Sequence, residues 1–102
     1  MSEQIKNDLL KIKGLLDRPE KWTQRTNARN SEGQAVEPND PDATCWCLRG
    51  ACIKLDLSST DLRAALTPGK SMISYNDREG TTYTDIVILI DCAITAQGGN
   101  PA

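Results

Sequence analysis

The chain contains no histidine among its 102 residues. Serine and cysteine hydrolases that use imidazole as their base are therefore excluded within a single chain. Catalytic zinc sites that depend on imidazole ligands are excluded for the same reason. The sequence also has no P-loop, no other glycine-rich phosphate loop and no dinucleotide-binding fingerprint. We expect no cofactor and no bound metal.

Long apolar runs are absent as well. No run approaches the roughly 20 residues that a membrane span requires, and the first six residues lack the apolar core of a signal peptide. Hydrophobic residues make up 38% of the chain and charged residues 25%, which is typical of a soluble globular protein. We therefore expect a cytoplasmic protein without a membrane partner. It should form a single domain over residues 1–97, followed by a loose tail at 98–102.

The charge of the chain is unevenly distributed, although its net value is only −2. Residues 1–29 carry seven Lys and Arg against four acids, whereas residues 30–102 carry five against ten. A basic segment of this kind can contact an acidic partner or a phosphate backbone. We favour the solvated face of a helix followed by an exposed hairpin, so we do not expect nucleic acid as a partner.

Residues 41–55 are predicted to form the central helix. Asp40 can cap its start, and a proline follows at the first helical position. The segment is apolar nearly all round, as helices buried among other elements are. Its small side chains, Cys47, Gly50 and Ala51, allow another segment to approach closely. We therefore expect Gly50→Leu to destabilise the fold by more than about 2 kcal/mol.

Two further helices are predicted, over residues 3–17 and 59–66. The first carries one apolar stripe, spaced every three or four residues, and must end before Pro19. The second begins with a Ser58 cap and Asp61 three positions later. Residues 70–75, which follow it, are ambiguous.

A last helix is predicted over residues 83–97. The β-branched run at 86–90 is also compatible with a buried strand. We favour a helix because Thr82 and Asp85 form a capping box and Gly98 can terminate the helix.

Residues 22–37 are predicted to form a short hairpin. Residues 30–33, Asn-Ser-Glu-Gly, read as a turn that ends on a glycine in the left-handed region. Thr26 and Ala28 would pair with residues 35 and 36, and Trp22 would anchor the hairpin; an irregular loop of the same length is the alternative. The predicted fold is mainly α, a compact bundle of about four helices around the buried central helix, with this hairpin between the first two.

The four cysteines, at positions 45, 47, 52 and 92, invite a metal or redox interpretation. If residues 41–55 are helical, Cys45 and Cys47 point about 200° apart and cannot share an ion. We interpret the cysteines as small apolar fillers of the core. A reactive Cys45 is the alternative, although no base is evident beside it.

Asp77 and Glu79 are a second candidate pair, on either side of Arg78 in a predicted turn over residues 76–80. Two carboxylates can bind a cation or serve as acid and base. We favour a structural role, in which Asn76 and Asp77 shape the turn and the following residues are solvated.

Several motifs together resemble a family of small bacterial and phage proteins of unknown function. The matching residues are Trp-Thr at 22–23, Trp-Cys-Leu-Arg-Gly-Ala at 46–51 and Asn-Asp-Arg-Glu-Gly-Thr-Thr at 76–82. The chain departs from the family at Tyr75, where members often have tryptophan, and in a shorter segment before the Asn-Asp turn. The resemblance implies the layout of the chain but no activity, and it places the turn alongside the second helix.

Two functional hypotheses remain. The first is a small binding or accessory protein that attaches to a host protein or a small ligand. The second is an enzyme that uses Cys45 or the Asp77/Glu79 pair. A site is expected where the hairpin, Arg49 and the turn meet, with Arg49 paired to Asp77. The sequence is compatible with a homo-oligomer as well as with a monomer. The candidate binding residues are Trp22, Arg25, Arg29, Arg49, Tyr75, Asn76 and Asp77.

Overall fold

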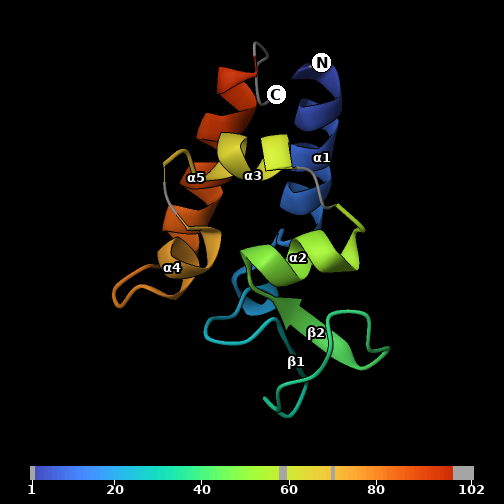
Figure 1. Cartoon of the computed structure of the whole chain (residues 1–102). Helices are drawn as coiled ribbons and strands as arrows, with labels where there is room; N and C mark the ends of the chain where they lie inside the picture. Colours follow the sequence, from blue (N-terminus) through green and yellow to red (C-terminus); the bar gives the residue numbers. More distant parts are fainter. Residues whose placement is uncertain (1, 58–59, 70, 98–102) are drawn as a thin grey trace.

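A computed structural model describes residues 2–57, 60–69 and 71–97 of the chain. It is mainly helical, as predicted, with a two-stranded antiparallel sheet between the first two helices (Figure 1). The cap expected at Ser58 lies outside the described residues. In chain order the elements are helix α1 (Ser2–Leu15), the 3-10 turn η1 (Pro19–Lys21), strands β1 (Ala28–Asn30) and β2 (Ala43–Trp46), and helices α2 (Leu48–Lys54), α3 (Thr60–Leu66), α4 (Met72–Asp77) and α5 (Tyr83–Ala96).

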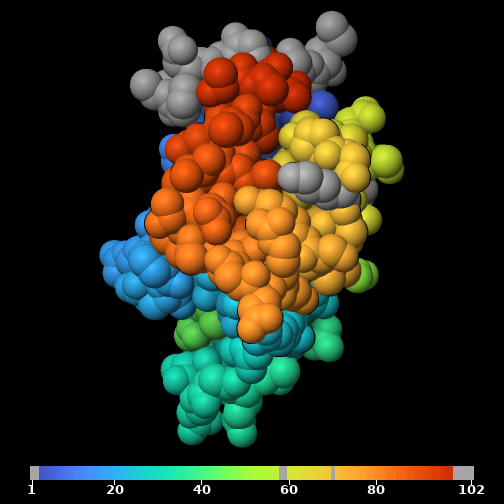
Figure 2. Space-filling model, turned by 90° about the vertical axis from the view of Figure 1, so that its left-hand side faces the viewer, coloured from blue at the N-terminus to red at the C-terminus, as the bar shows by residue number. Residues whose placement is uncertain are grey.

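The long helices α1 and α5 lie side by side, and α3 packs against both (Figure 1). Helix α2 lies between this group and the strands, so it is central in position as predicted. The strand region forms one end of the molecule, below the face covered by α4 and α5 (Figure 2). The apolar stripes of α1, α3 and α5 meet in one core together with residues of β2 and α2. Its large buried members include Leu9, Ile12, Leu16, Trp46, Leu48, Leu62, Leu66, Ile86, Ile90 and Ile94.

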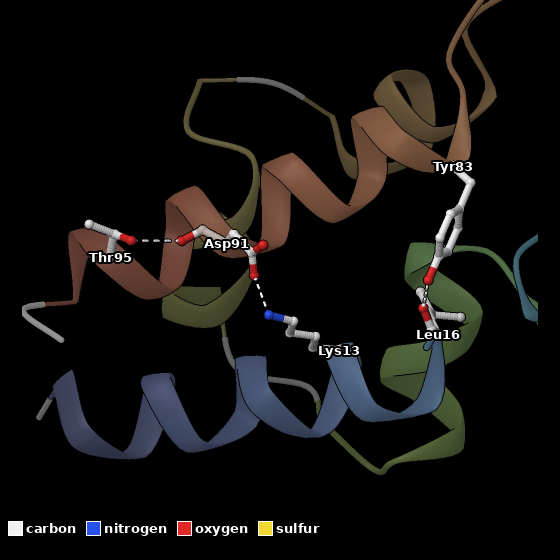
Figure 3. Close-up of polar contacts among 5 residues, drawn as sticks. All are labelled: Lys13, Leu16, Tyr83, Asp91 and Thr95. Atoms are coloured by element: carbon white, nitrogen blue, oxygen red, sulfur yellow. Dashed lines mark hydrogen bonds and ion pairs between the residues drawn. The ribbon is translucent and has the colours of Figure 1, made fainter. Parts of the chain in front are cut away.

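Polar contacts fix α1 against α5 at two levels (Figure 3). The Lys13 ammonium lies 2.7 Å from Asp91 Oδ1, and the Tyr83 hydroxyl donates to the Leu16 carbonyl at 2.6 Å. The second bond satisfies a carbonyl just beyond the end of α1, where the helix itself offers no donor.

The prediction of one helix over 41–55 is wrong in its first half. Residues 43–46 form β2, and α2 begins only after Cys47, whose Sγ accepts a hydrogen bond from Gly50 N at 3.2 Å. Asp40 does not cap a helix: its carbonyl and carboxylate accept bonds from the backbone N–H groups of Ala43 and Asp42 and close a turn. A short polar residue before proline is common in turns as well as at helix starts, so this pattern does not distinguish the two.

The hairpin has the predicted turn but a different partner strand. Gly33 N donates to the Asn30 carbonyl at 3.0 Å, and Gly33 has a φ of 81°. Part of the predicted pairing is present, since Ala35 forms a bridge with Arg29 and Val36 N donates to the Ala28 carbonyl at 3.0 Å, but the main ladder joins β1 to β2. The register places Ala28 opposite Trp46 and Arg29 opposite Cys45, with an irregularity after Arg29. The β-branched and aromatic side chains of β2 suit a strand better than residues 34–37 do.

Helix α4 was not predicted. Ser71 Oγ caps it by accepting from Ser74 N at 3.2 Å, and the expected turn over 76–80 begins only after Asp77. Residues 86–90 are helical, as predicted, and both bonds of the Thr82–Asp85 capping box are present.

Gly50 permits the tight contact expected of the small side chains in this region. It is buried, and an ideal Cβ at this position would lie 1.8 Å from the carbonyl oxygen of Asn27. That oxygen belongs to the backbone and accepts a bond from Cys47 N, so it cannot move aside freely. The close approach therefore requires glycine at position 50.

We predict that Gly50→Ala already destabilises the protein by more than about 2 kcal/mol, because the added methyl forces α2 away from the strand region. Gly50→Leu should cost at least as much. Urea denaturation of the variants measures the change. The matched control is Gly14→Ala in α1, where a Cβ meets nothing within 4 Å; it should stabilise by about 0.5–1 kcal/mol. Equal effects at the two glycines would contradict the contact.

Candidate functional site

A buried amide connects α4 to two other parts of the chain. Asn76, fully buried at the end of α4, accepts through Oδ1 from Trp22 Nε1 at 2.7 Å and from Leu48 N at 3.1 Å. Its Nδ2 donates to the Thr23 carbonyl at 3.1 Å. Both groups that reach the oxygen are obligatory donors, so the orientation of the amide is fixed by chemistry. We call this group of contacts the Asn76 node.

Neighbouring residues extend the node. Gln24 Nε2 donates to the Asn76 carbonyl at 2.9 Å, and Asp77 Oδ1 accepts from Arg25 N at 2.8 Å and from Asn76 Nδ2 at 2.9 Å. Arg25 has a φ of 70°, which a non-glycine residue adopts only at a cost. The bond to Asp77 helps to hold this backbone in place.

Four of the predicted site residues therefore meet, namely Trp22, Arg25, Asn76 and Asp77. Their hydrogen bonds run to one another, to nearby backbone and to the Gln24 side chain. Arg25 takes part only through its backbone N–H, and its side chain is exposed. A buried network that is satisfied from within serves to specify the fold. The node is accordingly a structural support.

Arg29 also bonds within the protein. Its guanidinium donates to Thr23 Oγ1 at 2.9 Å, to the Gly33 carbonyl at 3.0 Å and to the Gln24 carbonyl at 3.1 Å. These three bonds brace the loop that carries the Asn76 node. Tyr75 is half-buried, its ring lies 5.3 Å from the Arg78 guanidinium carbon, and its carbonyl accepts from Thr81 Oγ1.

The expected Arg49–Asp77 ion pair is not formed. Asp77 lies at the far end of α4 and faces the backbone at residue 25, whereas Arg49 lies in the first turn of α2 and faces the start of α4. Arg49 is exposed and lines a cleft of about 550 Å³ between α2, α3 and the start of α4. The lining residues of this Arg49 cleft are Arg49, Thr60, Arg63, Ala64, Thr67, Gly69, Ser71, Met72 and Ile73.

Among the described residues, two cations and no carboxylate line the Arg49 cleft. Within residues 2–57, 60–69 and 71–97, neither the Arg49 nor the Arg63 guanidinium forms an ion pair or a hydrogen bond. Their charges therefore add to one positive potential over a concave surface. Sequence reasoning missed Arg63, because its role depends on α4, which brings residues 71–73 opposite α3.

The cysteines are free thiols with different environments. Cys45 lies in β2, so the helical geometry used against a shared ion does not apply; its Sγ lies 3.8 Å from the Arg29 carbonyl oxygen. Burial raises the pKa of Cys47, and burial raises that of Cys52 to about 11 although the Arg63 charge opposes it. Among the described residues, no three Cys, Asp or Glu side chains are grouped as a metal ion would require.

The chain belongs to a family of unknown function, DUF6197, whose model matches residues 1–96. The resemblance to a family without a known activity is thereby confirmed. Neither the curated proteins nor the solved structures include a match. In the part of the chain that the structure describes, no helix has the length and apolar character to cross a membrane.

We predict that Asn76→Ala destabilises the protein by at least about 3 kcal/mol, because each buried group left without a partner costs about 1–3 kcal/mol. The groups concerned are the Trp22 indole N–H, Leu48 N–H and the Thr23 carbonyl. Chemical denaturation gives the value. Asn39→Ala, at an exposed turn position, is the control and should change stability by less than about 0.5 kcal/mol. A similar small change for Asn76→Ala would disprove the role of the node.

Alkylation separates a structural thiol from a catalytic one. With a pKa of about 11, only about one Cys52 thiol in a thousand is ionised at pH 8, and the thiolate is the nucleophile. We predict that iodoacetamide modifies the exposed Cys92 first and reaches Cys47 and Cys52 only on unfolding, as followed by peptide mass spectrometry. Modification of Cys45 well ahead of Cys92 would instead favour a thiol enzyme.

Proposed function

We propose that the protein is a small binding protein that holds an anionic small molecule in the Arg49 cleft. The observation that carries this proposal is the pair of guanidinium groups, Arg49 and Arg63, which face one cleft and have no hydrogen-bond or ion-pair partner among the described residues. A guanidinium offers a planar fork of donors that matches carboxylate and phosphate oxygens. The volume of about 550 Å³ lies within the range of small-molecule sites.

The polar lining of the cleft supports an anion further. Thr60 and Ser71 bring hydroxyl groups to the same concave surface. Ser71 Oγ accepts a bond from Ser74 N, which leaves its hydroxyl proton free to be donated to a ligand. Two guanidinium groups and a hydroxyl donor form a set that neutral ligands would not satisfy.

The Asn76 node supports the same function indirectly. It joins the end of α4 to the first residue of α2, and these two helices carry opposite walls of the cleft. A site on packed helices keeps its donors in place better than one on loops. The node thus preorganises the cleft.

An enzymatic function has less support. Cys45, Asp77 and Glu79 are not among the residues that line the Arg49 cleft. Asp77 accepts hydrogen bonds from the backbone and from Asn76, which suits a structural carboxylate.

Calorimetric titration with inorganic phosphate and with citrate tests the proposal. We expect binding to the native protein, with Arg49→Met and Arg63→Met each weakening it at least tenfold, since each removes a charge-assisted bond of about 1.5–3 kcal/mol. Both variants should melt close to the wild type, because neither guanidinium bonds within the described chain. Arg18→Met, at an exposed position that does not line the cleft, should bind as the wild type does. Equal affinities for all four proteins would refute an anion site at the cleft.

A further inference from the structure

The Arg49 cleft has an apolar side as well as a cationic one. Ala64, Met72 and Ile73 line it together with the two arginines. Met72 is buried, whereas Ile73 is 42% exposed and is one of three large apolar side chains that are exposed among the described residues. An exposed isoleucine beside a binding cleft can be covered by a ligand.

The cationic and the large apolar side chains of the cleft come from different helices. Arg49 and Arg63 come from α2 and α3, and residues 72 and 73 come from the first turn of α4. A ligand held by the guanidinium groups would therefore extend toward α4. Methionine adapts its shape to apolar groups of different outline, which suits a site for a small organic molecule.

We infer that the ligand of the Arg49 cleft is an amphipathic organic anion, with a carboxylate or phosphate group bound by Arg49 and Arg63 and an apolar body packed on Met72 and Ile73. The inference rests on the proposed function and narrows it. A purely polar anion would leave Ile73 exposed and would gain nothing from the α4 wall.

The decisive comparison is between inorganic phosphate and phenyl phosphate, which share the anionic group and differ in the apolar body. We expect phenyl phosphate to bind at least tenfold more tightly by calorimetry. Acetate and benzoate form a second pair, which separates carboxylate from phosphate recognition. In each pair the aromatic member should bind more tightly.

A variant in the apolar wall completes the test. Ile73→Ser should weaken phenyl phosphate several-fold and leave inorganic phosphate unchanged. Ile88→Ser is the matched control, because Ile88 is 55% exposed on α5 and does not line the cleft. It should alter neither affinity.

The outcomes distinguish a failure of the amphipathic ligand from a failure of the anion site itself. Binding of inorganic phosphate with no gain from the phenyl group, or no effect of Ile73→Ser on phenyl phosphate, would overturn the amphipathic ligand and leave the anion site standing. If none of the four anions binds, the proposed function itself fails, and this inference fails with it.

Discussion

The side-chain amide of Asn76 is the interaction on which the arrangement of the shorter elements depends. One amide satisfies the Trp22 indole, the first N–H of α2 and the Thr23 carbonyl, all from positions distant in sequence. Helices as short as α2 and α4 are not stable alone, since most helical stability in proteins comes from tertiary packing. The amide therefore positions two helices that sequence propensity alone would not maintain, and both of these helices contribute residues to the lining of the Arg49 cleft.

Much of the helical core could be predicted, because α1 and α5 are long enough to carry a complete apolar stripe and α5 has a reciprocal cap. The strand β2 could not be predicted from the sequence. Its pairing with β1 is non-local, and the polar and proline residues before it suit a turn as well as a helix start. Cys47 is buried, as expected of a small apolar filler, but its sulfur also accepts a hydrogen bond from Gly50 N at the start of α2. A thiol is a weak hydrogen-bond acceptor, so a cysteine in the sequence does not indicate a helix cap.

The contacts expected around the candidate site are present only in part, since Arg49 and Asp77 do not pair. Trp22, Arg25, Asn76 and Asp77 do come together, but they bond to one another and to backbone. An aromatic or charged residue that looks available in a sequence is often needed by the backbone around it. The Arg49 cleft depends on α4, which brings residues 71–73 to the cleft and which the sequence pattern did not indicate.

The segment from residue 23 to residue 27 is held through its main chain as well as through the side chains of Thr23, Gln24 and Asn27. The carbonyls of Thr23, Gln24 and Asn27 accept bonds from Asn76, Arg29 and Cys47, and the last also abuts Gly50. The main-chain contacts fix the number of residues that can lie between Thr23 and Asn27. Within the family, insertions and deletions are therefore expected to be excluded from this stretch, so that an alignment would show it as a block of constant length.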